Sequence, residues 1–154
     1  MKHLERLLRK RRRRIVGLMS GTSADGVDAA LIEVETLDSG PGPLTWELLD
    51  FLSLPYEDAV RAEILLLQEG GAERAVERTA RLHFLIAHLF SDAVERLASD
   101  SGVPLHSIDA IASHGQTLAH FPAFDAPLST NLERREGSEW VSPATFQIGE
   151  PAVI

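Results

Sequence analysis

A glycine-rich turn between two apolar segments constrains the fold of this chain more than any other feature. Residues 15–20 (IVGLMS) form a short apolar run that predicts a buried strand, and residues 21–26 (GTSADG) predict a turn. Residues 27–35 then alternate, with one face made by Val27, Ala29, Leu31 and Glu33 and the other by Asp28, Ala30, Ile32 and Val34. Because Asp-Gly between two such runs is a strong hairpin signal, the sequence predicts an antiparallel strand pair.

The next segments extend this hairpin. Residues 38–43 form a Gly/Pro loop, and residues 44–54 predict a third strand beside the second. A helix is predicted over residues 55–68, with Pro55 near its start and two glycines beyond its end. A second helix is predicted over residues 72–99, with an apolar stripe made by Val76, Ala80, Phe84, Ala87, Phe90 and Val94.

The rest of the chain completes a mixed sheet. Residues 108–113 predict a fourth strand, parallel to the first because a helix intervenes. Residues 119–143 predict a long surface loop, and residues 144–148 predict a fifth strand. The order predicts an α/β fold with a mixed five-stranded sheet, three antiparallel strands coming first. A helix beginning at Pro151 would have one turn before Ile154, which does not offset its nucleation cost, so we expect a truncated fold.

Charge is distributed unevenly along the 154 residues. Residues 1–14 carry +7, which leaves −15 for the remainder, and an acidic body argues against nucleic acid as the main partner. The basic residues 9–14 are read as a solvated extension or, alternatively, as a surface for RNA or anionic lipid. No apolar run has the length of a membrane span or signal peptide, so we expect a cytoplasmic location. The absence of cysteine excludes disulfides and thiolate metal sites.

The first motif with a chemical reading covers residues 17–28. Its glycines allow close backbone approach and positive φ, and successive N–H groups in such a turn form an anion-binding nest. Hydroxyl donors are added by Ser20, Thr22 and Ser23. Asp25 and Asp28 could hold the water shell of Mg²⁺. The pattern is neither a P-loop nor a dinucleotide fingerprint, and a hairpin with incidental hydroxyls remains the alternative.

Two further motifs follow predicted strands. Residues 113–117 (SHGQT) end the fourth strand, where ligands of α/β sheets gather, and their polar groups can bond sugar hydroxyls or an amide. His114 and His120 are read as polar contacts or as histidines with a structural hydrogen bond. Residues 147–150 (QIGE) place polar groups at the end of the fifth strand. The sequence shows no Ser-His-Asp spacing and no metal-ligand cluster.

Together these three segments resemble the anhydro-N-acetylmuramic acid kinase family. That family carries a Gly-Thr-Ser-x-Asp-Gly-x-Asp turn, a Ser-His-Gly-Gln-Thr segment and a Gln-Ile-Gly-(Asp/Glu)-Pro segment, which match residues 21–28, 113–117 and 147–151. The resemblance covers residues 15–154 and leaves residues 1–14 as a basic extension. It implies a lobe of the ribonuclease H-like, actin-like ATPase fold, incomplete at the C-terminus.

The resemblance also implies a function. The family uses ATP and Mg²⁺ to phosphorylate 1,6-anhydro-N-acetylmuramic acid while water opens the anhydro ring, in cell-wall recycling. It implies ATP and phosphate binding by Gly21, Thr22, Ser23, Ala24, Asp25, Gly26, Val27 and Asp28, with Asp25 and Asp28 reaching the metal through water. It implies sugar binding by Ser113, His114, Gly115, Gln116, Thr117, Gln147, Gly149 and Glu150. The catalytic aspartate is expected in an Asp-Phe-Arg segment beyond Ile154, so none is assigned here.

Partners and alternatives follow from the same reading. The expected partners are ATP and a small amino sugar, not nucleic acid or membrane, and a homodimer of the full-length form stays open. The chain alone is expected to be inactive. One alternative is a non-catalytic nucleotide- and sugar-binding half that pairs with a second polypeptide. Another is a basic-tailed protein that binds nucleic acid or a membrane surface.

Overall fold

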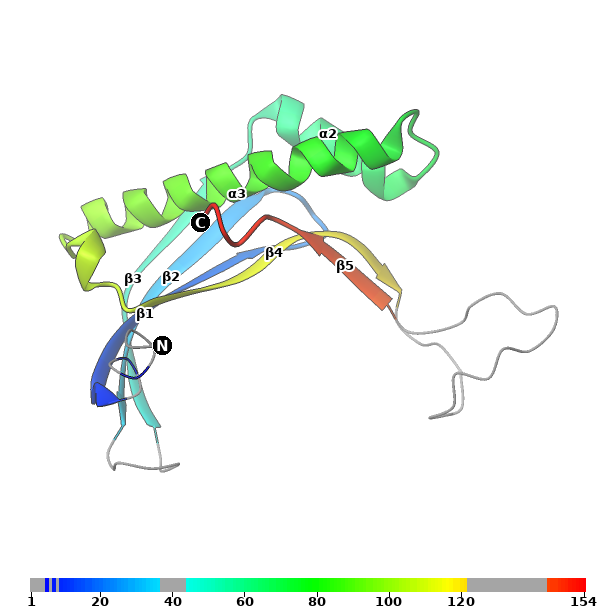
Figure 1. Ribbon diagram of the computed structural model, residues 1–154. Coiled ribbons are helices and arrows are strands. Elements are labelled where there is room, and N and C mark those ends of the chain that lie inside the picture. Colours follow the sequence, from blue (N-terminus) through cyan, green and yellow to red (C-terminus); the bar gives the residue numbers. More distant parts are fainter. Residues whose placement is uncertain (1–4, 6, 8, 37–43, 122–143) are drawn as a thin grey trace, which may run out of the picture.

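A five-stranded mixed sheet forms the body of the molecule (Figure 1). The computed structural model describes residues 5, 7, 9–36, 44–121 and 144–154. The strands are β1 (Arg12–Ser20), β2 (Gly26–Thr36), β3 (Leu44–Pro55), β4 (Ala110–Phe121) and β5 (Ala144–Ile148). The helices are α2 (Asp58–Glu69) and α3 (Ala75–Asp100), followed by a 3₁₀ turn at Leu105–Ser107.

The strand order is β3-β2-β1-β4-β5. The first three strands pair antiparallel, β4 is parallel to β1, and β5 is antiparallel to β4. This confirms the predicted α/β class, the three antiparallel strands at the start and the parallel fourth strand. This strand order is consistent with the actin-like ATPase lobe that the resemblance implies.

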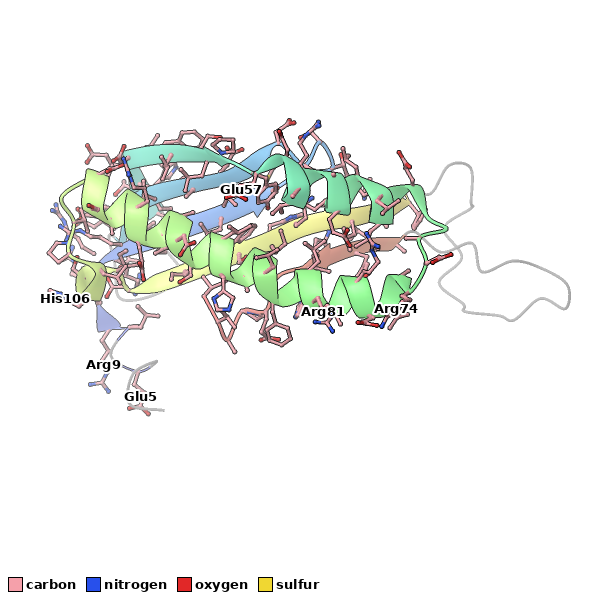
Figure 2. All side chains as sticks on the ribbon, turned by 90° about the horizontal axis from the view of Figure 1, so that it is seen from above. Glu5, Arg9, Glu57, Arg74, Arg81 and His106 are labelled. Carbon is pink, nitrogen blue, oxygen red and sulfur yellow. The ribbon has the colours of Figure 1, made fainter. Side chains whose placement is uncertain are left out.

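Both helices lie over the same face of the sheet, so the molecule has two layers (Figure 1). Figure 2 shows α2 and α3 from above, lying across the strands. The alternation predicted for β2 is confirmed, because Val27, Ala29 and Leu31 are buried against the helices while Asp28 faces the other way. We call the opposite side, which no helix of the described residues covers, the bare face.

The predicted stripe of α3 is partly wrong. Val76 and Phe84 are 86% and 51% exposed. Ala80 is exposed as well, whereas Ala87, Phe90 and Val94 are buried as predicted. The rest of the buried stripe is made by Leu82, Ile86, Ala93, Leu97 and Ala98. Apolar residues are dense in this helix, and their spacing alone permits two overlapping stripes. Contact with the sheet selects one of them.

Several element boundaries differ from the prediction. Pro55 ends β3 and pairs with Gly26, whereas the sequence reading placed it at the start of a helix. β4 continues eight residues past the predicted end at Ser113, because β5 pairs with its second half. Residues 151–153 form a turn. The predicted loop at 38–43 and most of the loop at 119–143 lie outside the described residues.

β1 begins at Arg12, within the stretch that the sequence reading treated as a basic extension. Arg12 lies 3.3 Å from Glu35, Arg14 lies 3.5 Å from Glu33, and Lys10 lies 2.7 Å from Asp109. Such surface pairs contribute little stability each, but they fix the side chains on the acidic body. Part of the positive charge of residues 9–14 is therefore neutralised by acidic side chains of the body.

Candidate functional site

Three carbonyl groups of the turn between β1 and β2, residues 21–25, accept hydrogen bonds from other parts of the chain. The carbonyl of Gly21 accepts a hydrogen bond from the Gln116 amide at 2.7 Å, and that of Thr22 accepts one from the Gln68 amide at 3.1 Å. The carbonyl of Asp25 accepts from the backbone N–H of Tyr56 at 3.1 Å. Three elements therefore hold the turn from the inside.

The outer side of the same turn carries free donors. Thr22, Ser23 and Asp25 are exposed, and their N–H groups donate no hydrogen bond within the described residues. A Cβ on Gly21 would meet nothing within 4 Å, so its backbone is open to close approach. Consecutive N–H groups without an internal partner are the feature that an anion-binding nest requires.

The backbone of the turn differs from the prediction in one respect. None of its glycines has a positive φ, and the left-handed residue is Ala24, at φ 52°. Ala24 is fully buried, as is Val27, so of these two residues only backbone groups could reach a ligand. Gly26 is required for a different reason, because a Cβ there would lie 2.1 Å from the carbonyl oxygen of Leu54 on β3.

The two aspartates of the motif have different surroundings. The Asp25 side chain is 73% exposed and lies 3.5 Å from Arg61 of α2. The carboxylate of Asp28 accepts a 2.7 Å hydrogen bond from the Ser53 hydroxyl on β3 and faces the bare side of the sheet. Asp28 is therefore the better placed of the two to face a ligand on that side.

A shallow hollow of about 610 Å³ lies on the bare face where β1, β2, β3 and β4 meet. It is lined by Gly17, Leu18, Met19, Asp28, Ala30, Phe51, Ala112, Ser113 and His114. The hollow thus joins one residue of the predicted phosphate motif, Asp28, to two of the predicted sugar motif, Ser113 and His114.

A bulge in β4 separates the halves of the Ser-His-Gly-Gln-Thr motif. Leu18 pairs with Ser113, but Ser20 pairs with Gln116, so β4 has an extra residue at this point. Gly115 adopts φ +77°, and a Cβ there would lie 2.5 Å from the carbonyl oxygen of Ile148. The motif lies within β4, whereas the sequence reading placed it at the strand end.

Beyond the bulge, the side chains point into the protein. Gln116 is fully buried, and its amide bonds Gly21, Thr117 and the Ser20 hydroxyl. Thr117 is 6% exposed. The Ser20 hydroxyl lies 2.6 Å from both Gln116 and the Gly26 carbonyl. The Ser20 and Gln116 side chains are therefore buried and bonded within the protein, and neither lines the hollow.

The third motif follows β5 and is fixed to α3 by His83. Thr117 pairs with Gln147, which places this motif beside the second one, as the resemblance implies. The N–H of Gly149 donates to Nδ1 of His83 at 3.0 Å, and Nε2 of His83 lies 3.3 Å from Glu150. The bond to Gly149 makes Nδ1 an acceptor, so the proton of the neutral ring is on Nε2.

Hydrogen bonding shifts the pKa of Glu150. The N–H of Ala152 donates to its carboxylate at 3.0 Å, and this bond, followed by that of His83, lowers the pKa of Glu150 below 4.5. Gln147 donates to the Thr145 hydroxyl at 2.5 Å on the same strand. The polar groups of the third motif are thus engaged mainly in fixing the turn after β5.

Three contributors to the site were missed from the sequence. Gln68, Tyr56 and His83 lie on or before helices, where a polar residue beside an apolar stripe is ordinary. Burial raises the pKa of Tyr56 to about 12, and its hydroxyl has no hydrogen-bond partner among the described residues, although nearby Ser20 offsets the shift slightly. Only the tertiary structure shows that Gln68, Tyr56 and His83 lie beside the motifs.

Neither a metal-binding cluster nor a membrane-spanning helix is found in the part of the chain that the structure describes. No three His, Asp or Glu side chains there gather as a metal ion would need. No described helix combines the length and the apolarity needed to cross a bilayer.

Comparison with known proteins matches the chain to a single family. The sequence model of the family described as anhydro-N-acetylmuramic acid kinase matches residues 13–137. A protein named anhydro-N-acetylmuramic acid kinase from Caldanaerobacter subterraneus subsp. tengcongensis is 41% identical over 155 residues, covering 100% of this chain and 35% of the relative. Proteins of the same name from Salinibacter ruber and Clostridioides difficile are 35% and 38% identical, covering 96% and 90% of this chain and 34% and 32% of their own lengths. The chain spans about a third of the length of these relatives.

Proposed function

Because the chain belongs to the anhydro-N-acetylmuramic acid kinase family, we propose that it supplies part of the phosphate-binding and sugar-binding sites of such a kinase. In the proposed reaction, ATP phosphorylates O6 of 1,6-anhydro-N-acetylmuramic acid while water opens the anhydro bridge at C1. The products are N-acetylmuramic acid 6-phosphate and ADP. The reaction belongs to the recycling of cell-wall sugars.

The turn at residues 21–25 is the observation that carries this proposal. Its inward carbonyls and the exposed, unbonded N–H groups of Thr22 and Ser23 suit the β- and γ-phosphates of ATP. Phosphoryl transfer depends on positioning and on electrostatic stabilisation, both of which a rigid turn with outward donors provides.

Mg²⁺ fits the exposed carboxylates beside this turn. A bound ion would supply positive charge against the phosphates, and Mg²⁺ bound to phosphates usually keeps several waters. Asp28 and Asp25 would hold it through those waters. Asp28 is held by the Ser53 hydroxyl, which restricts the directions in which its carboxylate can point.

The hollow on the bare face supports the assignment of the sugar side. Ser113 and His114 offer a hydroxyl and a ring nitrogen to a carbohydrate, while Met19 and Phe51 offer apolar surface. Asp28 lines the same hollow, so a sugar bound there would lie next to a carboxylate of the proposed phosphate motif. We propose this hollow as the sugar side of the cleft.

A chimera tests the function of these residues. Residues 1–154 would replace the matching segment of the relative from Caldanaerobacter, and sugar-dependent ADP release would be measured with Mg²⁺ present. We expect activity in the chimera and a loss on the order of a hundredfold in kcat for Asp28→Asn. The control Asp92→Asn removes a charge from an exposed position on α3 and should leave the rate unchanged.

Two results would count against the proposal. A folded chimera without sugar-dependent turnover would oppose the kinase assignment for this chain. Full activity of the Asp28→Asn chimera would instead remove Asp28 from the site. Far-ultraviolet circular dichroism of each chimera would show whether it has folded.

The 154 residues alone are proposed to be inactive. They span a third of their relatives, and losing general-base assistance by itself costs typically ~10²–10⁴-fold in rate. We expect no measurable ADP release and ATP binding weaker than micromolar by calorimetry. Sugar-dependent ADP release from these residues alone would contradict this.

A second candidate is a nucleotide- and sugar-binding half that acts with a second polypeptide. The bare face favours it, because Trp46, Leu48 and Phe51 are more than half exposed there. Co-expression with the C-terminal two thirds of the Caldanaerobacter relative would test it. Recovery of kinase activity from two separate chains would support this candidate, and recovery only from a covalent chimera would oppose it.

A further inference from the structure

Two glutamine side chains bond the turn at residues 21–25 from different elements. Gln116 of β4 donates to the Gly21 carbonyl at 2.7 Å and to the Thr117 carbonyl at 2.9 Å. Gln68, near the end of α2, donates to the Thr22 carbonyl at 3.1 Å and to the Thr117 carbonyl at 3.0 Å. The shared acceptor on Thr117 joins the turn, β4 and α2 into one hydrogen-bonded unit.

The peptide geometry of the turn gives these bonds a consequence on its outer side. In a trans peptide the C=O and N–H groups point in opposite directions. The Gly21 carbonyl shares its peptide plane with the Thr22 N–H, and the Thr22 carbonyl shares its plane with the Ser23 N–H. Drawing the two carbonyls inward therefore directs the two donors outward.

The Gly21 and Thr22 carbonyls are both bonded by uncharged side-chain donors. A primary amide supplies two N–H donors, and both pairs are used here. The Gln116 oxygen lies 2.6 Å from the Ser20 hydroxyl, whose single proton can go to this oxygen or to the Gly26 carbonyl. Rotating the Gly21–Thr22 peptide would leave a donor of the buried Gln116 side chain without its carbonyl, which is costly. Rotating the Thr22–Ser23 peptide would break the more exposed bond from Gln68.

We propose that Gln68 and Gln116 are positioning residues that hold the turn in its anion-accepting conformation. The proposal rests on the proposed function of this turn in binding phosphate. It gives Gln116 a role distinct from the sugar contact that its motif suggested. It also adds Gln68, which lies outside all three motifs.

The test uses Gln68→Met, because Gln68 is only partly buried and its loss leaves the core intact. Methionine has a similar length and no donors. Leu66→Met on the exposed side of the same helix is the matched control. The probe is inorganic pyrophosphate, titrated into the ¹⁵N-labelled 154-residue chain and followed by amide chemical shifts.

We expect the Thr22 and Ser23 resonances of the wild type to shift with pyrophosphate. Gln68→Met should weaken binding roughly tenfold, since it loses both the bond that orients the Thr22 carbonyl and the bond that ties α2 to Thr117. Without ligand, this variant should also lose hydrogen-exchange protection at the N–H groups of Ala24 and Tyr56, which bond the turn's carbonyls. The melting temperature should stay close to that of Leu66→Met.

The outcomes separate this proposal from the function it rests on. Wild-type affinity and wild-type protection in Gln68→Met would overturn the positioning role while leaving the phosphate site intact. The wild type could fail to bind pyrophosphate while Gln68→Met still loses hydrogen-exchange protection. That result would support the positioning role of Gln68 but oppose the phosphate-binding function of the turn. Gln116→Met should show the same pattern more strongly, and a folded, fully binding Gln116→Met would count against the proposal.

Discussion

The hydroxyl of Ser20 and the side-chain oxygen of Gln116 lie 2.6 Å apart, although 96 positions separate them in the sequence. The contact exists because β1 and β4 are parallel neighbours and a bulge brings these two residues into register. The contact links β1, which leads into the turn at residues 21–25, to the motif at residues 113–117, for which sugar binding was predicted. The motifs at residues 21–28 and 113–117 are therefore joined by a hydrogen bond between neighbouring strands.

Gly26 should tolerate no side chain. A Cβ at this position would lie 2.1 Å from the Leu54 carbonyl oxygen, so Gly26→Ala should lower the free energy of unfolding by about 1–3 kcal/mol or more. Gly21→Ala is the control, because its Cβ would meet nothing within 4 Å. Urea denaturation of both variants checks this, and equal midpoints would contradict the expected close approach of β3.

Glu150 should contribute to stability in an acid-sensitive way. Its pKa is lowered in the folded state, so its contribution is complete above its ordinary pKa of 4.5 and is lost as pH falls through the lower folded value. Glu150→Gln should therefore reduce the decline of the melting temperature between about pH 6 and pH 3. The exposed Glu69→Gln removes the same charge from α2, and an identical pH profile for the two variants would exclude a specific role for Glu150.

Tyr56 is the single tyrosine of the chain, so its titration can be followed directly. Burial raises its pKa to about 12, and the phenolate absorbance should appear near that pH in the folded protein and near 10 after unfolding. Because the folded state holds the proton more tightly, the contribution is present below pH 10 and is lost as pH rises through 12. A native titration midpoint near 10 would mean that the hydroxyl is solvated.

Tyr56→Phe tests the unpaired hydroxyl. Since the hydroxyl is buried with no partner among the described residues, its removal should leave stability unchanged or raise it by up to about 1 kcal/mol below pH 10. Chemical denaturation near neutral pH provides the measurement. A loss of more than about 1 kcal/mol would show that the hydroxyl makes a bond that stabilises the fold.

The bare face should promote self-association of the isolated chain. Trp46, Leu48 and Phe51 are 69%, 51% and 54% exposed, and contiguous apolar surface of this kind is a known cause of association. Leu48→Lys combined with Phe51→Lys should shift sedimentation towards the monomer. The same double substitution at Leu66 and Val76, which are exposed on the helices, should have a smaller effect.

Local pattern was sufficient for much of the fold. The alternation in β2 identified the buried face through Val27, Ala29 and Leu31, and the intervening helices indicated a parallel fourth strand. It was not sufficient where apolar residues are dense, as in α3, whose buried stripe includes Leu82 but not Phe84. Periodicity alone does not choose between overlapping stripes, because the choice depends on which side meets the sheet.

The sequence by itself determined the strands, the composition of the turn at residues 21–25 and the three motifs that identify the family. The tertiary structure decided which polar groups of those motifs are available to a ligand. It turned Gln116 inward, left Ser113 and His114 beside Asp28, and brought Gln68 under the turn. The physical reason is that strand register and helix packing bring together side chains that are far apart in the sequence. The residues next to a side chain in the sequence therefore do not determine its hydrogen-bond partner.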